Sequence, residues 1–300
     1  MEFVRKERAV AKPRIGYVGV GLMGLPMLKR LASLGYAVTA YDLVADRLEA
    51  ARAAGARDAA SPAEAAMNAD LVLLNLPTTA AVENAVFGEG GAGAVLRAPQ
   101  LVVDFSTIPP AKARELAGRL HAAGGAGWID APVSGGPPAS GEGTLTVMAG
   151  GEAAEFERAL PLLKDVSARC TRLGPVGSGL AAKMINQLVV GIGHAMLAEA
   201  IVLAEGAGLD AAKLPQALAG GLADSNLMQR FYPRMLKREF APQGYVRQLL
   251  KDLEMVHEFA AATKSPTPMT AQALSLYRML AHLGHTELDT TALIKLYDAR

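Results

Sequence analysis

The stretch that decides the fold is Arg14-Ile-Gly-Tyr-Val-Gly19-Val-Gly21-Leu-Met-Gly24, which joins a short apolar strand directly to a helix. The first glycine of such a pattern allows a tight turn, the second lets the backbone approach a pyrophosphate, and the third permits close packing of helix on strand. The phosphates lie at the helix N-terminus, where backbone N–H groups point outward. We therefore predict a dinucleotide site at Gly19, Gly21, Leu22, Met23 and Gly24.

A second predicted strand, residues 36–41, ends in Asp42. The spacing from Gly19 fits an acid that accepts hydrogen bonds from the adenosine ribose, and a carboxylate there repels a 2′-phosphate, so NAD is favoured over NADP. Arg47 lies one turn into the next helix and can swing toward a phosphate, which leaves NADP open. The alternative role for Asp42 is as N-cap of a helix over 45–54.

Apolar strands then alternate with helices, which predicts a parallel sheet covered on both faces with ligands at the carboxyl ends of its strands. Two such strands lie at 71–77 and 101–107. Leu76, Pro77 and Thr107 stand at their ends, and we expect these three residues to line the cofactor.

A strand over 128–134 ends in Ser134, Gly135 and Gly136. Consecutive backbone N–H groups without obstructing side chains can hold a carboxylate, and the serine adds a donor. The sequence therefore predicts a substrate carboxylate site here. An ordinary turn explains the two glycines equally well.

From Gly177 onward strand patterns give way to helical periodicity, beginning with one long apolar helix that runs to about Gly206. Lys183 and Asn186 lie three residues apart near its start and share one face. Burial lowers the pKa of a lysine, which suits a proton donor or acceptor. The alternative is a lysine that lies along a core helix with its charge in solvent.

These patterns predict an α/β chain with a loose leader over 1–13, a Rossmann-type doubly wound domain over 14–175 and an all-helical domain over 176–300, joined through the long helix. The helical half is so apolar that we expect it to share a surface with a second copy, in a homodimer or homotetramer.

Composition narrows the functional classes. A net charge of +1 from 30 basic and 29 acidic residues gives no footprint for nucleic acid or an anionic membrane. The single cysteine, Cys170, excludes an internal disulfide and fits a reducing compartment, so we expect a cytoplasmic protein. The scattered histidines predict no metal site. No apolar run reaches the ~18 residues that span a membrane.

Four motifs in order resemble the β-hydroxyacid dehydrogenase family, which includes 3-hydroxyisobutyrate dehydrogenase and 2-hydroxy-3-oxopropionate (tartronate semialdehyde) reductase. The resemblance covers about residues 14–298. The motifs are Gly19-Val-Gly-Leu-Met-Gly-Leu-Pro-Met27, Asp130-Ala-Pro-Val-Ser-Gly-Gly136, Gly179-Leu-Ala-Ala-Lys-Met-Ile-Asn-Gln187 and Lys251-Asp-Leu253.

The resemblance implies a 6-phosphogluconate dehydrogenase-like helical domain and hydride transfer between a nicotinamide and the carbonyl carbon β to a carboxylate. It implies that Lys183 is the general acid/base and that Asn186 orients the substrate, whose carboxylate binds at 134–136. Lys251 and Thr107 are then cofactor contacts. Phe240 is a wall beside the nicotinamide or ordinary core.

One departure bears on the substrate. The 3-hydroxyisobutyrate enzymes carry a tryptophan-containing segment where this chain has residues 224–229, a polar stretch with Ser225 and Asn226. These two residues favour a hydroxylated acid over a methyl-bearing one, unless they only cap the next predicted helix, 227–240. Two rivals share the architecture, an imine reductase and a non-catalytic dinucleotide-binding protein; loss of the lysine is typical of both.

Overall fold

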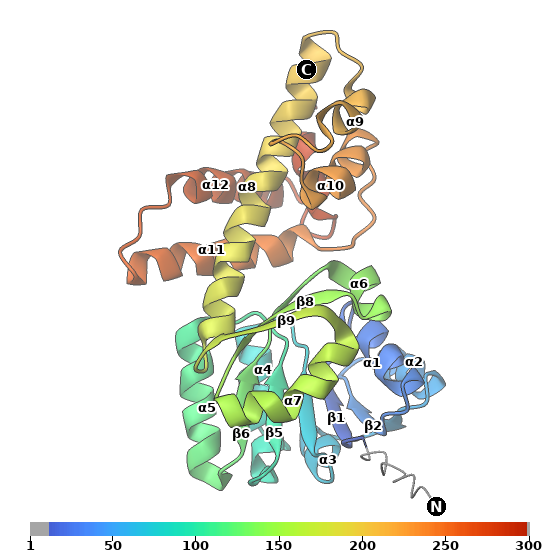
Figure 1. The fold of residues 1–300 in the computed structure, drawn as a ribbon, viewed down its shortest axis with the longest axis vertical. Helices are drawn as coiled ribbons and strands as arrows, with labels where there is room; N and C mark the ends of the chain where they lie inside the picture. Colours follow the sequence, from blue (N-terminus) through green and yellow to red (C-terminus); the bar gives the residue numbers. More distant parts are fainter. Residues whose placement is uncertain (1–11, 299–300) are drawn as a thin grey trace, which may run out of the picture. The chain divides into compact units, whose positions relative to one another are not determined.

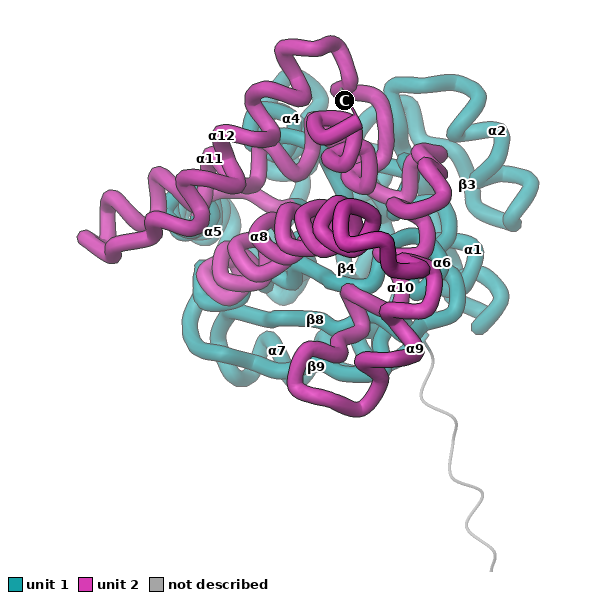
Figure 2. Tube along the Cα trace, turned by 90° about the horizontal axis from the view of Figure 1, so that it is seen from above, with its two compact units in different colours: residues 1–106, 110–179 teal, residues 107–109, 180–300 magenta. Residues whose placement is uncertain are grey.

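The computed structural model describes residues 12–298, so most of the predicted leader lies outside the described residues. The chain forms two compact units (Figure 2). The first comprises the described residues up to Ser106 and Pro110–Gly179, and the second comprises Thr107–Pro109 and the chain from Leu180 onward. The chain passes from one unit to the other just after the predicted domain boundary, with the exception of the short segment Thr107–Pro109.

The first unit is built on a sheet that has nine strands within residues 12–298, in the order β3-β2-β1-β4-β5-β6-β8-β7, with β9 paired to β8. The six strands from β3 to β6 are parallel, which confirms the predicted doubly wound sheet. The later strands differ, because β8 runs antiparallel to β6 and β7. The strands are β1 (Ile15–Val18), β2 (Val38–Tyr41), β3 (Arg57–Asp58), β4 (Leu71–Leu74), β5 (Leu101–Asp104), β6 (Gly127–Asp130), β7 (Val133–Ser134), β8 (Leu145–Gly150) and β9 (Ser167–Gly174).

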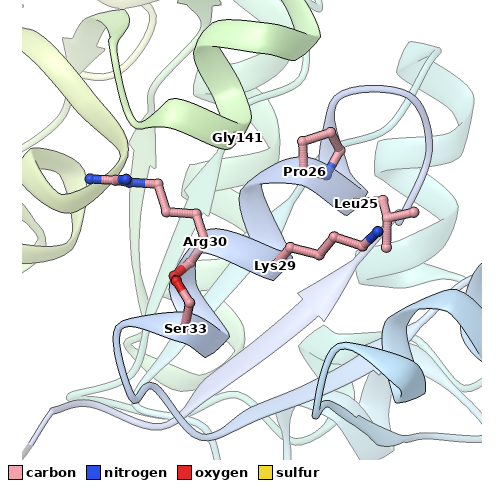
Figure 3. A pocket seen from close by; sticks show the side chains of 6 residues that line it. All are labelled: Leu25, Pro26, Lys29, Arg30, Ser33 and Gly141. Atoms are coloured by element: carbon pink, nitrogen blue, oxygen red, sulfur yellow. The ribbon is translucent and has the colours of Figure 1, made fainter.

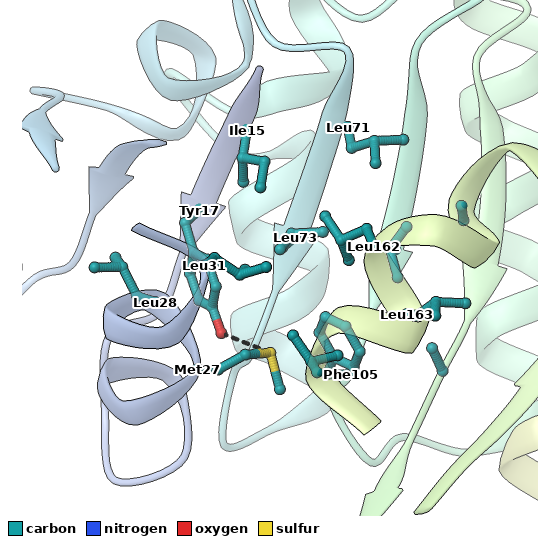
Figure 4. Packing of buried hydrophobic residues seen from close by; sticks show 14 of the residues in the cluster. Ile15, Tyr17, Met27, Leu28, Leu31, Leu71, Leu73, Phe105, Leu162 and Leu163 are labelled. Atoms are coloured by element: carbon teal, nitrogen blue, oxygen red, sulfur yellow. Dashed lines mark hydrogen bonds between the residues drawn. The ribbon is translucent and has the colours of Figure 1, made fainter. Parts of the chain in front are cut away.

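Helices follow the strands, as the sequence predicts. In the first unit they are α1 (Gly24–Ser33), α2 (Ala45–Ala53), α3 (Pro62–Ala66), α4 (Thr79–Phe87), η1 (Ala92–Ala94), α5 (Pro110–Gly124), α6 (Gly136–Glu142) and α7 (Ala153–Val166). Figure 4 shows apolar side chains of α1 and α7 packed against those of β1 and β4 on one face of the sheet. On the other face α3 approaches so closely that a Cβ on Gly16 would lie 2.4 Å from Ala65 O. Both faces are therefore covered.

The second unit is helical among the described residues, as predicted. It contains α8 (Ser178–Gly206, whose first two residues fall in the first unit), η2 (Ala211–Lys213), α9 (Leu214–Leu218), α10 (Asn226–Leu236), α11 (Val246–Ala262), α12 (Pro268–His282) and η3 (Thr290–Leu296). The long helix α8 is prominent in Figure 1, where α11 and α12 run side by side. The buried residues of α11, α12 and η3 form one apolar cluster, and those of α8 and α10 form another.

Two details depart from the sequence prediction. The helix expected over 227–240 ends at Leu236, because Arg238 adopts a left-handed φ of 57° that no helix continues. From the sequence we expected no apolar run long enough to span a membrane. Among residues 12–298, however, α8 alone is long and apolar enough to do so by length and composition, and 44% of its most apolar window is buried.

Candidate active site

The glycine-rich loop after β1 is as tight as its sequence predicts. Gly19 has a left-handed φ of 97°, and a Cβ there would lie 2.4 Å from Asn75 O at the end of β4. A Cβ on Gly24 would lie 2.2 Å from Gly19 O. The loop therefore rests directly on the neighbouring strand and on the first turn of α1. Only glycine fits at these two positions.

Asp42 connects this loop to the end of β2. Its carboxylate accepts hydrogen bonds from Val20 N at 2.7 Å and from Val44 N at 2.9 Å, and its side chain is only 7% exposed. The N-cap of α2 is Val44, which makes no side-chain cap, so the alternative N-cap role for Asp42 is wrong. Asp42 instead holds the loop in place with a buried negative charge.

Arg47 brings a cation to the same corner. One guanidinium nitrogen lies 3.5 Å from an Asp42 carboxylate oxygen and 3.8 Å from the point that a Cβ on Gly21 would occupy. The loop at Gly21 thus has room for a ligand oxygen, with N–H groups at the start of α1 and a guanidinium beside it. These residues fit a dinucleotide pyrophosphate.

The other predicted cofactor contacts lie at strand ends. Leu76 follows β4, and its N–H donates to Ser106 Oγ at 2.9 Å, which ties the β4 and β5 ends together. Pro77 beside it is exposed. Thr107 belongs to the second unit, where its carbonyl oxygen accepts from Lys251 Nζ at 3.0 Å. The structure thus pairs two predicted cofactor contacts, Thr107 and Lys251.

The predicted carboxylate site follows β7. Gly135 and Gly136 have φ angles of 137° and 76°, and a Cβ on Gly135 would lie 2.7 Å from Ala139 Cβ. Both positions require glycine. Successive residues with positive φ leave Ser134 and two backbone N–H groups at the start of α6 without intervening side chains. The turn can present donors to a carboxylate, and it also serves as an ordinary connection, so both interpretations of this segment stand.

A surface pocket also occurs in the first unit, at α1 and α6 (Figure 3). None of the predicted site residues lines it. Its lining is Leu25, Pro26, Lys29, Arg30, Ser33 and Gly141.

The start of α8 is fixed by Asp130, a fully buried carboxylate at the end of β6. Asp130 Oδ1 accepts from Gly177 N at 2.7 Å, just before the helix begins. A negative charge at a helix N-terminus is stabilised by the helix dipole. A Cβ on Gly179 would lie 2.3 Å from Met148 O, so this first turn also packs tightly against β8.

Lys183 lies in the second turn of α8 and is 8% exposed. Burial lowers the pKa of Lys183 to about 8; the charge of Lys251 acts in the same direction, while that of Asp252 opposes it. The side chain does not carry its charge out into solvent, which argues against the alternative drawn from the sequence. An amine with a pKa near 8 exchanges protons readily at physiological pH.

Next to Lys183 on α8, a hydrogen-bond chain crosses to α11. Asn186 Nδ2 donates to Gln187 Oε1 at 2.7 Å, and Gln187 Nε2 donates to Asp252 Oδ2 at 2.6 Å. Lys251 Nζ lies 3.2 Å from Asp252 Oδ1, an ion pair without hydrogen-bond geometry. The sequence prediction missed Gln187 and Asp252. Two signals in the sequence could have found them: Gln187 lies one helical turn after Lys183, and Asp252 directly follows Lys251.

The remaining predicted residues sit apart from this chain. Ser225 caps α10, with its Oγ accepting from Met228 N at 3.1 Å, and Asn226 is the exposed first residue of that helix. Phe240 packs against the apolar clusters of the second unit, with Lys295 Nζ 5.4 Å from its ring centroid. Among the residues from 12 to 298, no group of three metal-binding side chains occurs.

Comparisons with known proteins agree with this arrangement. A family model for the NAD binding domain of 6-phosphogluconate dehydrogenase matches residues 14–174, and one for NAD-binding of NADP-dependent 3-hydroxyisobutyrate dehydrogenase matches 177–297. The 2-hydroxy-3-oxopropionate reductase of Escherichia coli is 35% identical over 94% of this chain and 96% of its own length. The NAD-dependent L-serine dehydrogenase of Pseudomonas aeruginosa is 36% identical over 95% and 98%.

Solved structures give the same result. The 3-hydroxyisobutyrate dehydrogenase of Mycobacterium tuberculosis, solved with L-serine, is 30% identical, with a TM-score of 0.87 over 96% of this chain and all of that one. Sequence, fold and the nucleotide loop therefore agree, and the chain belongs to the β-hydroxyacid dehydrogenase family of NAD(P)-dependent oxidoreductases.

Proposed function

We propose that the protein interconverts a small β-hydroxyacid and its semialdehyde, with Lys183 as general acid/base. One observation carries this proposal: a lysine that is 8% exposed, with its pKa lowered to about 8, shares a helix face with an amide that can orient a substrate. A buried amine needs a reason, because desolvation of its charged form is costly. Proton transfer to and from a substrate oxygen supplies one.

The glycine-rich loop would hold a nicotinamide cofactor, which would supply the hydride chemistry at the substrate carbonyl carbon. In the direction of reduction, the Lys183 ammonium donates a proton to the developing alkoxide. In oxidation, the neutral amine removes the hydroxyl proton. Asn186 orients the substrate, and Ser134 with the N–H groups of Gly135 and Gly136 binds the carboxylate.

We favour a hydroxylated substrate of the 2-hydroxy-3-oxopropionate type. The E. coli relative carries that name, and Ser225 and Asn226 supply polar groups in place of a tryptophan. The Ser225 oxygen is used as a helix cap but its O–H remains a donor. 3-Hydroxyisobutyrate is the competing substrate, since relatives of that name match at similar identity.

For the cofactor we favour NAD, because Asp42 places a negative charge where a 2′-phosphate would lie. Arg47 beside it offsets part of that charge and offers a phosphate partner. The proposal is therefore a preference for NAD with measurable use of NADP.

We also propose a homodimer or homotetramer assembled through α8. The exposed apolar residues Ile185, Val189, Met196 and Leu203 are 62%, 59%, 53% and 75% exposed. Their spacing places them on one stripe of the helix, on the face opposite Lys183. A second copy that covers this stripe would remove the apolar surface from water without obstructing the catalytic face.

The test is an assay at pH 7 to 9 of purified protein with 2-hydroxy-3-oxopropionate and NADH or NADPH, and with a panel of 3-hydroxyacids and NAD or NADP. We expect turnover of at least one compound, and loss of about 10²- to 10⁴-fold in kcat for Lys183→Ala, the usual contribution of a positioned acid/base. Cofactor binding by that variant, followed by NADH fluorescence, is the folding control. Cofactor binding without any turnover by the wild type would contradict the proposal and favour the imine reductase or non-catalytic alternatives.

A further inference from the structure

The hydrogen-bond chain beside Lys183 has only one possible polarity. A carboxylate can only accept hydrogen bonds, so the end of Gln187 that faces Asp252 must be its NH₂ group. The carbonyl oxygen of Gln187 then faces Asn186, which must present its own NH₂ group in return. The buried charge of Asp252 thus determines the orientation of two amides in succession, which is otherwise ambiguous in proteins.

The hydrogen-bond chain is anchored at its Asp252 end and accessible to solvent at its Asn186 end. Gln187 and Asp252 are 8% and 4% exposed, so neither has water as an easy alternative partner. Lys251 approaches the second oxygen of Asp252 at 3.2 Å and is itself held by Thr107 O at 3.0 Å. The only member with substantial access to solvent besides Lys251 is Asn186, which is half-buried. Its carbonyl oxygen is the end of the amide that Gln187 does not use.

We propose that Gln187 is a positioning residue: its bond to Asp252 fixes the orientation of the Asn186 amide. The Asn186 carbonyl oxygen is then available to a substrate hydroxyl other than the one that exchanges its proton with Lys183. This inference rests on the proposed function, because it assigns Asn186 as the residue that orients the substrate. It also gives a reason for a buried carboxylate next to a lysine that must be neutral for oxidation. Asp252 accepts a hydrogen bond from Gln187 and pairs with Lys251, in addition to its effect on Lys183.

A charge-exchange cycle tests the proposal. In Gln187→Glu two carboxyl groups face each other, and the new one keeps the chain polarity only while it is protonated. Its folded-state pKa is raised above the unfolded value, so the stability it contributes is present at low pH and is lost as pH rises. In Gln187→Glu combined with Asp252→Asn, the amide at position 252 donates to the carboxylate at position 187. That carboxylate still accepts from Asn186, so the polarity at Asn186 is restored without a proton.

We expect Gln187→Glu to lose about 10- to 100-fold in kcat/KM at pH 8, as for loss of a hydrogen bond to a charged group, and to lose less at pH 6. Its Tm should fall between pH 5 and pH 8 relative to wild type. The double variant should recover about tenfold or more in kcat/KM at pH 8, together with the Tm. Gln272→Glu, at an exposed position of α12, is the matched control and should change neither measurement.

The outcomes separate the two proposals. If the wild type is active and Gln187→Glu matches it at every pH, or if the double variant is no better than the single one, the positioning role is overturned while the proposed function stands. If the wild type turns over no hydroxyacid, the proposed function fails. The Tm values of the single and double variants then still test the hydrogen-bond chain, because recovery of Tm in the double variant requires the contact between positions 187 and 252.

Discussion

Arg47 and Asp42 illustrate how two residues of opposite charge share one cofactor corner. The carboxylate is committed to Val20 N and Val44 N, so it stays in place whichever cofactor binds. The guanidinium is half-exposed and contacts it at 3.5 Å. We propose that the balance between these two charges sets the discrimination against a 2′-phosphate.

We therefore predict that Arg47→Ala lowers kcat/KM for NADP(H) by about tenfold or more, equivalent to about 1.4 kcal/mol, and changes kcat/KM for NAD(H) much less. Steady-state kinetics with both cofactors measure this directly. Arg52→Ala on the same helix is the matched control, since Arg52 pairs with Asp58. Equal losses with the two cofactors would show that Arg47 contacts a group that they share.

Single-residue roles were predictable where local backbone demands fix them. Gly19 and Gly24 could be assigned from spacing alone, because the turn excludes a side chain at both positions. The bond between Gln187 and Asp252 could not, because it joins residues 65 apart on two helices and depends on how those helices pack. The structural role of Asp42 was also not predictable from the local pattern, because its partner Val20 lies in the loop after a different strand, β1.

At the scale of elements, α8 carries different residues on two opposite faces. Its inner face carries Lys183 and Gln187 and continues into the apolar cluster with α10, while the stripe from Ile185 to Leu203 is exposed. This exposed stripe also explains why α8 is apolar enough to resemble a membrane span. An apolar stripe of this length is unusual on a monomeric protein.

We predict that Val189→Glu combined with Met196→Glu dissociates the oligomer, because two charges would have to be buried in an apolar interface. Light scattering coupled to size-exclusion chromatography should show the mass fall to half or less. Leu222→Glu, at a fully exposed leucine in the loop before α10, is the control and should leave the mass unchanged. A wild type that is already monomeric, or a double variant of unchanged mass, would contradict assembly through this stripe.

The predicted start of the long helix is close to the observed one, because Gly177 marks the position just before α8. The end of α10 was misplaced by four residues because Arg238 is not a residue type that signals a left-handed turn. The reversal of β8 was equally unmarked, since short apolar strands look alike whether their neighbours run parallel or antiparallel.

At the scale of the whole molecule, the candidate site residues are divided between two compact units. The first supplies the glycine-rich loop with Asp42 and Arg47, and the second supplies the lysine with its hydrogen-bond chain. The change from a sheet to helices was predictable from the change of periodicity near Gly177, because parallel sheets and helical bundles leave different patterns. The assignment of Thr107–Pro109 to the second unit was not, because it depends on a tertiary contact, the bond from Lys251 to Thr107 O.

The central claim is that Lys183 transfers the substrate proton, and the pH dependence of the oxidation rate tests it most directly. Oxidation needs the neutral amine, so log(kcat/KM) should rise with pH and level off above the Lys183 pKa of about 8; reduction needs the ammonium form and should decline through the same pKa. Lys183→Met should retain cofactor binding and lose most activity, and its residual rate should show no such change with pH near 8. If log(kcat/KM) of Lys183→Met still changed with pH near 8 as in the wild type, the assignment of Lys183 as the acid/base would be contradicted.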